Sequence, residues 1–393
     1  MKEQTIVLGI SGGIAAYKMA DLASRLTKEG YSVQVVMTEN AAKFIAPLTF
    51  ETLTGNKCLI DTFDRNFEWD VKHISLAKRA DVCLVAPATA NVCAKMAHGL
   101  ADDMLTTTLL AMRCPILIAP SMNTAMYENP VTQRNFQILR DLGHTVIEAE
   151  SGVLACRDVG KGRLPKIDVL YEYVMTALTP KDYTGKKVLV TAGPTCEPLD
   201  PVRYLTNRST GKMGYEIAKA AWRRGADVVL VSGKTALEPP VGVRVCPVES
   251  AAEMYDAVMA EAKDADVVIK AAAVADFTPA SVADNKLKKG DFSEMSIPLA
   301  RTKDILKALG EQKRPGQKLC GFSMETERLV EHSEQKLWKK NLDLVAANNV
   351  KVEGAGFGVD TNVVTLISKE GVRELPKMSK LEVAHALLDE LQK

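Results

Sequence analysis

The chain lacks the features that mark membrane, secreted or nucleic-acid-binding proteins. Its 393 residues contain no apolar run close to the roughly 18 residues that a membrane span needs. The N-terminus, Met1 to Gln4, leads straight into an apolar segment without a signal-peptide core. A formal net charge of +1 gives no general attraction to nucleic acid or to an anionic membrane. We therefore expect neither partner.

Cysteine is sparse and scattered. The eight cysteines include no CxxC pair, and they stand at positions 58, 83, 93, 114, 156, 196, 246 and 320. This pattern predicts neither a zinc site nor a disulfide framework, and it favours a reducing cytoplasm as the location.

What the chain does contain is a regular alternation of short Val/Ile/Leu runs with helical patterns, which predicts parallel sheets covered by helices on both faces.

The length of the chain predicts two domains rather than one. A polar stretch with Pro and Gly at 179–186 separates the halves. We expect two Rossmann-like doubly wound α/β domains, at 1–180 and 187–393, with a linker at 181–186. Strands are expected at 5–10, 32–37, 82–86, 115–119, 144–147, 187–191, 227–232, 266–271, 318–323 and 343–347, with a hairpin at 362–367 and 372–375.

Two glycine turns, at 9–13 and 193–195, each follow a predicted strand. Such a turn lets a phosphate approach the backbone and the N–H groups at a helix start. The first lacks the GxGxxG spacing of dinucleotide sites, and no acidic residue ends the second strand. Further on, Gly211 and Lys212 are followed by Met213, so a Walker A loop is absent as well. NAD and P-loop chemistry are therefore disfavoured.

The first half carries four further signals in order. They are His73, the small polar run 85–91 (VAPATAN), the segment 120–126 (PSMNTAM) and the loop around Cys156. With the glycine turn, these segments resemble the homo-oligomeric flavin-containing Cys decarboxylases, which carry a PxMNxxM motif and a catalytic Cys loop. The resemblance implies a flavodoxin-like flavoprotein decarboxylase domain. One departure is Arg157, where the family usually has Gly.

The resemblance also assigns roles. FMN contacts fall on Ser11, Gly12, Gly13, Thr38, Thr89, Asn91 and Thr106. Asn123 would hold the substrate carboxylate, His73 would act beside the flavin, and Cys156 would be the proton donor. The chemistry is reasonable, because a cysteine carboxylate loses carbon dioxide only when the carbanion is delocalised. Oxidation of the thiol to a thioaldehyde by FMN supplies that electron sink.

The second half carries another ordered set of motifs: 193–198 (GPTCEP), 200–203 (DPVR), the loop at Asn207, 271–277 (AAAVADF) and 286–289 (KLKK). Together they resemble phosphopantothenate–cysteine ligases, the partner domain of the decarboxylase in bifunctional bacterial enzymes. The implied CTP contacts are Ala271, Ala272, Asp276, Lys286, Lys303, Asp304, Ile305, Leu306, Phe322, Lys336 and Lys340.

In that family the carboxylate is first joined to a nucleotide phosphate. By resemblance, Asn207 and Arg203 would handle the acyl-cytidylate. Lys286 would stabilise the leaving pyrophosphate together with Mg²⁺, for which Asp276 is the expected ligand. Lys270 departs from the family, where an apolar residue or His more often precedes the Ala run, and its charge would lie near the triphosphate.

Together the resemblances imply a bifunctional enzyme of coenzyme A biosynthesis acting on 4′-phosphopantothenate, cysteine and CTP. They also imply a homo-oligomer with trimeric flavin domains and dimeric ligase domains. Two alternatives stay open. A flavin-dependent prenyltransferase or NAD(P) oxidoreductase would not explain Cys156 together with Asn123. A regulatory flavin-binding subunit without turnover would be favoured by loss of His73 or Cys156, and both are present.

Overall fold

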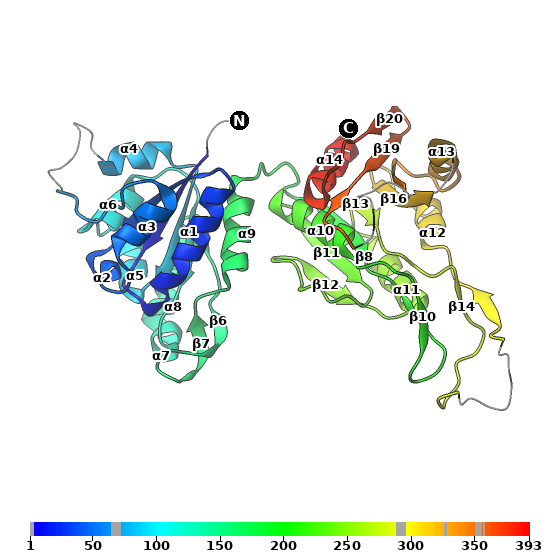
Figure 1. Ribbon diagram of the computed structural model, residues 1–393, viewed down its shortest axis with the longest axis horizontal. Helices are drawn as coiled ribbons and strands as arrows, with labels where there is room; N and C mark the ends of the chain where they lie inside the picture. Colours follow the sequence, from blue (N-terminus) through cyan, green and yellow to red (C-terminus); the bar gives the residue numbers. More distant parts are fainter. Residues whose placement is uncertain (1–3, 64–71, 288–295, 326–327, 350–355, 357) are drawn as a thin grey trace. The chain divides into compact units, whose positions relative to one another are not determined.

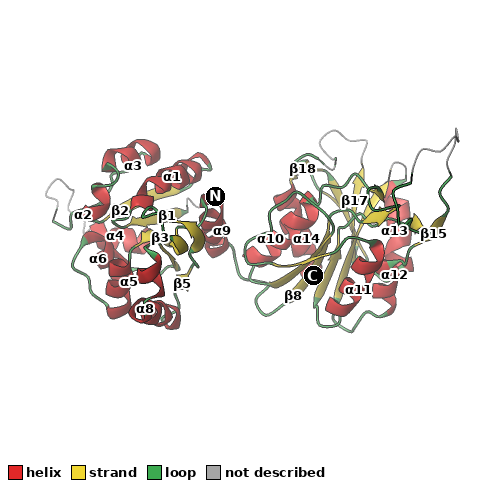
Figure 2. Cartoon of the chain, turned by 90° about the horizontal axis from the view of Figure 1, so that it is seen from below, coloured by secondary structure: helices red, strands yellow, loops and turns green. Residues whose placement is uncertain are grey.

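The computed structural model describes residues 4–63, 72–287, 296–325, 328–349, 356 and 358–393. The chain divides into two compact units, an N-terminal unit of Met1–Thr179 and a C-terminal unit of Pro180–Lys393 (Figures 1 and 2). None of the helices in the described ranges is long and apolar enough to cross a membrane.

The N-terminal unit is built on a five-stranded sheet in the order β2-β1-β3-β4-β5, with every pair parallel. This is the flavodoxin-like order, in which ligands bind beyond the carboxyl ends of the strands at the point where the order reverses. The strands are β1 (Thr5–Ile10), β2 (Ser32–Met37), β3 (Val82–Ala88), β4 (Ile116–Pro120) and β5 (Thr145–Val146).

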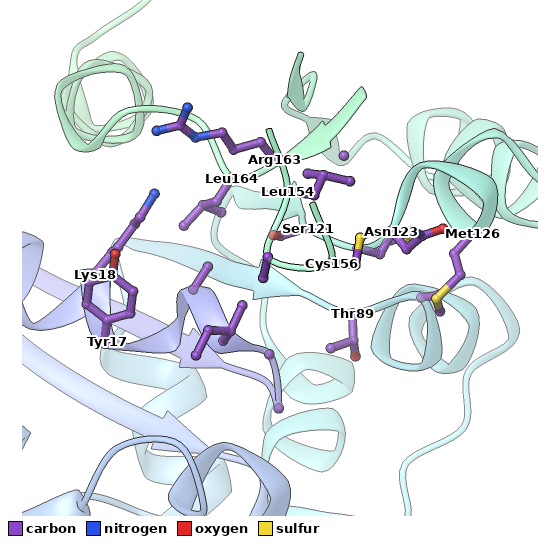
Figure 3. A pocket seen from close by; sticks show the side chains of 18 of the residues that line it. Tyr17, Lys18, Thr89, Ser121, Asn123, Met126, Leu154, Cys156, Arg163 and Leu164 are labelled. Atoms are coloured by element: carbon purple, nitrogen blue, oxygen red, sulfur yellow. Dashed lines mark hydrogen bonds between the residues drawn. The ribbon is translucent and has the colours of Figure 1, made fainter. Parts of the chain in front are cut away.

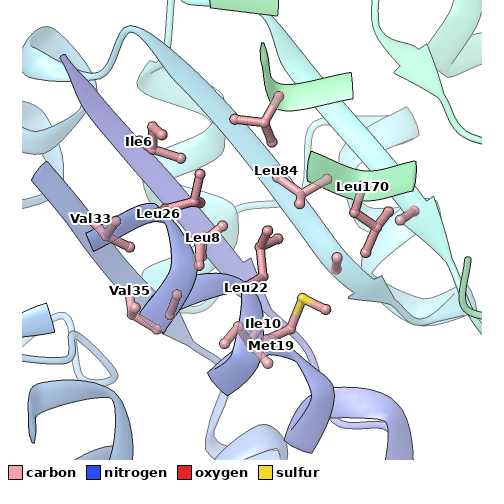
Figure 4. Packing of buried hydrophobic residues seen from close by; sticks show 14 of the residues in the cluster. Ile6, Leu8, Ile10, Met19, Leu22, Leu26, Val33, Val35, Leu84 and Leu170 are labelled. Carbon is pink, nitrogen blue, oxygen red and sulfur yellow. The ribbon is translucent and has the colours of Figure 1, made fainter. Parts of the chain in front are cut away.

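Helices cover both faces of this sheet because apolar residues point alternately to each side. Ile6 and Leu8 share one core with residues of α1, α3 and α9, and Figure 4 shows the part of it formed with Leu22, Leu26 and Leu170. Val7 belongs to the core on the opposite face of the sheet. The helices are the 3₁₀ turn η1 (Ile14–Lys18), α1 (Met19–Lys28), α2 (Glu39–Ala42), α3 (Pro47–Thr54), α4 (Lys72–Arg79), α5 (Ala90–His98), α6 (Met104–Ala111), α7 (Thr124–Glu128), α8 (Pro130–Asp141) and α9 (Ile167–Leu178).

An antiparallel hairpin stands apart from this sheet. It consists of β6 (Glu150–Val153) and β7 (Val159–Arg163), and its tip carries Cys156. The strand pattern did not predict this hairpin, because nearly all of its residues are exposed or half-buried and they lack an apolar run.

The C-terminal unit has an eight-stranded sheet in the order β12-β11-β8-β13-β16-β17-β19-β20. The first six strands are parallel and follow the 3-2-1-4-5-6 order of dinucleotide-binding folds, and β19 and β20 add the predicted antiparallel hairpin. The strands are β8 (Lys187–Ala192), β11 (Asp227–Ser232), β12 (Arg244–Pro247), β13 (Val267–Lys270), β16 (Lys318–Glu325), β17 (Leu344–Asn349), β19 (Val364–Ser368) and β20 (Gly371–Glu374).

Two helices pack on one face of the second sheet and three on the other. The first pair is α10 (Lys212–Arg223) and α14 (Lys380–Gln392), and the other three are α11 (Ala251–Glu261), α12 (Ile305–Glu311) and α13 (Leu329–Lys339). Three small antiparallel pairs complete the unit: β9 (Cys196–Pro198) with β10 (Tyr204–Thr206), β14 (Phe277–Pro279) with β15 (Leu299–Arg301), and β18 (Thr361–Asn362) with β21 (Met378–Ser379).

The predicted fold class, two doubly wound α/β domains, is confirmed. The expected strands 5–10, 32–37 and 227–232 match β1, β2 and β11 to the residue. The segment expected as a linker, 181–186, belongs to the C-terminal unit: Tyr183 is buried there, and its hydroxyl donates to the Leu388 carbonyl at 2.7 Å.

Candidate active sites

The first glycine turn joins the ends of β1 and β3. Ser11 is fully buried, and its hydroxyl donates to the Pro87 carbonyl at 2.7 Å while accepting from the Thr89 N–H at 2.9 Å. A Cβ on Gly12 would lie 2.5 Å from the Asn40 Cβ, so only glycine lets the turn pack against this neighbour. The hydrogen bonds of Ser11 and the packing against Asn40 therefore hold the turn in place, and its backbone can contact a ligand.

Above this turn lies a cavity of about 570 Å³, here called the first cavity, within the size range of cofactor sites. Five of the predicted residues line it: Gly12, Gly13, Thr89, Asn123 and Cys156. Helix α5 begins at its wall, with Thr89 as N-cap, which places the positive end of a nine-residue helix at the cavity. In Figure 3, Asn123 and Cys156 lie at one side of the cavity, away from Tyr17 and Lys18.

The tip of the hairpin holds a thiol, an amide and a carboxylate together. The Asn123 amide Nδ2 lies 3.3 Å from the Cys156 Sγ and donates to the Asp158 Oδ2 at 2.8 Å. The Cys156 thiol also donates to the Asp158 Oδ2, at 3.3 Å. Asn123 itself is oriented by the Ala125 N–H, which donates to its Oδ1 at 2.9 Å. Cys156 is exposed, so the thiol is open to a ligand.

Two hairpin residues have a left-handed backbone. Arg157 has a φ of 69°, which is strained for a residue with a side chain and which glycine adopts without strain. Gly162 has a φ of 143°, and a Cβ there would lie 2.2 Å from the Met122 carbonyl oxygen. The hairpin thus packs backbone to backbone against the loop that carries Asn123.

Five predicted residues of the first half do not line the first cavity: the buried Ser11 described above and four others. Thr38 caps α2, Thr106 is buried in a capping box with Asp103, Asn91 is exposed on α5, and His73 lies on α4. Sequence reasoning missed several that do line it, namely Tyr17, Lys18, Ser121, Met126 and Arg163, as well as Asp158 beside Cys156. The position of Lys18, one helical turn after Gly13–Ile14, was the available signal.

The second glycine turn depends on close packing of backbone. Gly193 has a φ of 75° and Gly211 a φ of 81°, and a Cβ on Gly211 would lie 3.3 Å from the Gly193 backbone. A Cβ on Gly214, in the first turn of α10, would lie 2.5 Å from the Ala192 Cβ. Helix α10 therefore starts directly against the end of β8.

Polar side chains join this turn to the small-residue run after β13. The Thr191 hydroxyl accepts from the Ala272 N–H and the Thr195 hydroxyl from the Ala275 N–H, each at 3.0 Å. The Asn207 amide donates to the Ala273 carbonyl, also at 3.0 Å. The motifs at 193–198 and 271–277, far apart in sequence, thus form one surface at the switch point of the sheet.

A cavity of about 570 Å³, the second cavity, opens on that surface. Six predicted residues line it, namely Asn207, Ala271, Ala272, Asp276, Phe322 and Lys336. Its described lining also includes four cations that are not among the CTP contacts implied by the family resemblance: Arg208, Lys212, Lys270 and Lys380. With Lys336 this makes five cationic side chains, against Asp276 as the one carboxylate of the described lining. Such a surface suits a polyanion.

The other predicted residues of the second half lie outside the lining of the second cavity. Asp304 caps α12 and pairs with Lys340 at 2.8 Å; Lys303 lies over the Tyr255 ring at 4.6 Å; and Ile305 and Leu306 are buried in the core. Lys286 is exposed, and Lys288 and Lys289 fall outside the described residues.

Arg203 holds the segment that carries Lys286. Its guanidinium donates to the Asp200 Oδ2 at 2.6 Å and to the Leu287 carbonyl at 2.7 Å. Asp200 also accepts from the backbone N–H groups of Val202, Arg203 and Leu287. These hydrogen bonds, the one from Arg203 first, hold the pKa of the Asp200 carboxyl well below its usual range.

No group of three or more His, Cys, Asp or Glu side chains within the described ranges is placed to hold a metal ion. Mg²⁺ commonly binds through one or two carboxylates together with substrate phosphates. Asp276 in the second cavity fits that mode, in which one carboxylate and the substrate phosphates share the ion. It does not fit a site in which protein side chains alone surround the metal.

Comparison with known proteins identifies a family for each of the two units. Residues 1–179 match the family model described as Flavoprotein, and residues 183–393 match the one described as DNA/pantothenate metabolism flavoprotein C-terminal domain. The coenzyme A biosynthesis bifunctional protein CoaBC of Bacillus subtilis (strain 168) is 49% identical over 100% of this chain and 97% of its own length. The chain belongs to this bifunctional family.

The CoaBC protein of Vibrio vulnificus (strain YJ016) is 46% identical, over 98% of this chain and 97% of its own. A crystal structure of the C-terminal domain of a CoaBC protein is 45% identical, covers 54% of this chain and 96% of that one, and has a TM-score of 0.46.

Proposed function

We propose that this chain carries out two consecutive reactions of coenzyme A biosynthesis. The C-terminal unit joins 4′-phosphopantothenate to cysteine with CTP through an acyl-cytidylate. The N-terminal unit then decarboxylates 4′-phosphopantothenoyl-cysteine to 4′-phosphopantetheine with FMN. The observation that carries the proposal is the pair of cavities at two switch points, one presenting a thiol and an amide and the other five cations. Eight free cysteines fit a reducing cytoplasm as the location.

In the first cavity, the residues present fit FMN. Gly12, Gly13 and Thr89 provide the small wall and the helix start that a phosphate and a flat ring need. When bound, FMN supplies the electron sink for loss of carbon dioxide. The Asn123 amide holds the substrate carboxylate, and the exposed Cys156 thiol delivers a proton. Asp158 must leave the Asn123 amide before a substrate carboxylate can take its place.

His73 does not line the first cavity of its own chain. We propose that a neighbouring copy supplies it, in keeping with a trimer of flavin units whose sites lie across interfaces, while the ligase units pair as dimers. An equimolar mixture of His73→Ala and Cys156→Ser chains should then recover part of the decarboxylation that each variant lacks. A mixture without activity would contradict a shared site.

In the second cavity, the cations neutralise the nucleotide triphosphate and Asp276 holds Mg²⁺ together with its phosphates. Asn207 and Arg203 handle the acyl-cytidylate, Arg203 also by fixing the segment at Leu287. Lys286 on that segment stabilises the leaving pyrophosphate. Loss of CTP consumption in a Lys286→Ala variant is expected, and unchanged consumption would remove Lys286 from the site.

The test is to supply the FMN-loaded protein with 4′-phosphopantothenate, cysteine and CTP. We expect 4′-phosphopantetheine, carbon dioxide, CMP and pyrophosphate in equal amounts. Product without CTP consumption would reject the ligase half, and accumulation of 4′-phosphopantothenoyl-cysteine would reject the decarboxylase half.

A further inference from the structure

Lys270 occupies an apolar position of a central strand. Its neighbours two residues away on either side, Val268 and Ala272, belong to the core that α11, α12 and α13 cover. The two-residue period of a strand places Lys270 on the same face. Its side chain is half-buried and lines the second cavity. A lysine in such a position costs free energy unless a partner holds its ammonium group.

The protein supplies no such partner among the residues that the structure describes, because no hydrogen bond or ion pair engages the Lys270 ammonium there. The nearby lysines differ. Lys336 donates to the Phe322 carbonyl at 2.6 Å, and Lys340 pairs with Asp304 at 2.8 Å. Lys270 is therefore an ammonium aimed at the cavity without a partner of its own.

The surrounding charges favour an incoming anion. Burial lowers the pKa of Lys270 to about 8, Lys336 and Lys340 lower it as well, and Asp304 and Asp276 act in the opposite direction. Arg208, Lys212 and Lys380 add positive charge to the same lining. A bound polyanion relieves the repulsion among these cations and holds Lys270 in its charged form.

We infer that Lys270 is a binding residue for the nucleoside triphosphate in the second cavity, an inference that rests on the proposed ligase function. It lies directly before the small-residue run, at the carboxyl end of β13, where the switch point of the sheet places ligands. An apolar residue at this position of β13 would offer the nucleotide only an apolar contact. Lys270 offers it a positive charge instead.

Calorimetric titration of the full-length, FMN-loaded protein with CTP and Mg²⁺ tests this inference. Lys270→Met, which keeps the length and removes the charge, should bind CTP about 10- to 100-fold more weakly. Lys270→Arg, which keeps the charge, should stay within about fivefold of the wild type. Lys307→Met, the same change on an exposed lysine of α12, should bind CTP as the wild type does.

Two further readouts separate binding from packing. CTP affinity of the wild type should fall as pH rises above about 8, because the ammonium then loses its proton. The CTP affinity of the methionine and arginine variants should not show this fall above about pH 8. The thermal midpoint of Lys270→Met should equal or exceed that of the wild type, since a buried charge is replaced by an apolar side chain. Lys270→Gln repeats the test if the methionine variant does not fold.

Equal CTP affinity of Lys270→Met and wild type would overturn the inference and leave the ligase proposal intact. Weaker binding of 4′-phosphopantothenate with unchanged CTP affinity would also overturn it, by assigning the lysine to the other anion. If the wild type neither binds nor consumes CTP, the ligase proposal fails and the inference fails with it.

Discussion

The two cavities occupy the same place in two similar sheets but differ in the side chains that line them. Each opens beyond the carboxyl ends of parallel strands at the switch point, next to a glycine turn. The first brings a thiol, an amide and a carboxylate together on a hairpin that is not part of the sheet. The second surrounds a small-residue floor with lysines and arginine. The comparison shows that the sheet decides where a site lies and the loops decide its chemistry.

A large effect on one reaction alone should come from Cys156, which lines the first cavity. Cys156→Ser should lower carbon dioxide release about 10²- to 10⁴-fold, because the proton donor is weakened, and leave ligation unchanged. Chromatography should then show 4′-phosphopantothenoyl-cysteine accumulating. Cys114→Ser, in a half-buried position outside the cavity, is the matched control. Retained carbon dioxide release would remove Cys156 as the proton donor.

Two alanine substitutions should disable one unit each. Gly162→Ala places a Cβ against the Met122 carbonyl and should abolish decarboxylation, whereas Gly214→Ala forces α10 from β8 and should abolish ligation. Each should cost its unit about 1–3 kcal/mol or more through overpacking. Assays of the two half-reactions with purified variants measure both effects.

The control for the glycine pair is Gly55→Ala. That residue has a φ of 71° but open space around its Cβ, so only backbone strain of about 1 kcal/mol is expected, with both activities retained. Loss of both activities in either cavity variant would contradict the independence of the two units.

Asp158 offers a smaller test within the first cavity. Its carboxylate accepts from the Asn123 amide that we assign to the substrate carboxylate. Asp158→Asn removes the repulsion between the two carboxylates and should lower the KM for 4′-phosphopantothenoyl-cysteine by a few-fold, about 1 kcal/mol in binding. Steady-state kinetics of decarboxylation measures it, with Asp168→Asn as the exposed control. A raised KM would show that Asp158 assists binding instead.

The smallest effect concerns the departure from the family at Arg157. Because its φ is 69°, Arg157→Gly should relieve about 1 kcal/mol of backbone strain in the hairpin. Arg157→Ala retains a Cβ and should not. Limited proteolysis of the hairpin distinguishes the variants, and equal cleavage of glycine and alanine variants would show that the backbone there is unstrained.

Much of the fold could be predicted from sequence because apolar runs mark buried strands directly, as in β1, β2 and β11. The hairpin of β6 and β7 could not, since its exposed and half-buried residues form no such run. Lys270 was visible as a charge beside small residues, but its place between Val268 and Ala272 on one face required the strand register.

The site residues divide in the same way. Motifs on turns that follow strands, such as Gly12, Asn123 and Asn207, line the cavities, because strand ends converge. His73 and Lys286 do not line the cavities. The sequence of one chain carries no pattern for a side chain that reaches a site from another copy or through movement of its segment. Asp304 and Lys340, predicted as ligand contacts, pair with each other at 2.8 Å.

The most direct test of two separate sites is a mixing experiment. Cys156→Ser and Gly214→Ala proteins are supplied, separately and together, with 4′-phosphopantothenate, cysteine and CTP, and 4′-phosphopantetheine is measured. Neither variant alone should form it, and the mixture should, because the intermediate made by one is decarboxylated by the other. An inactive mixture of folded proteins, or product from either variant alone, would contradict two cavities with one reaction each.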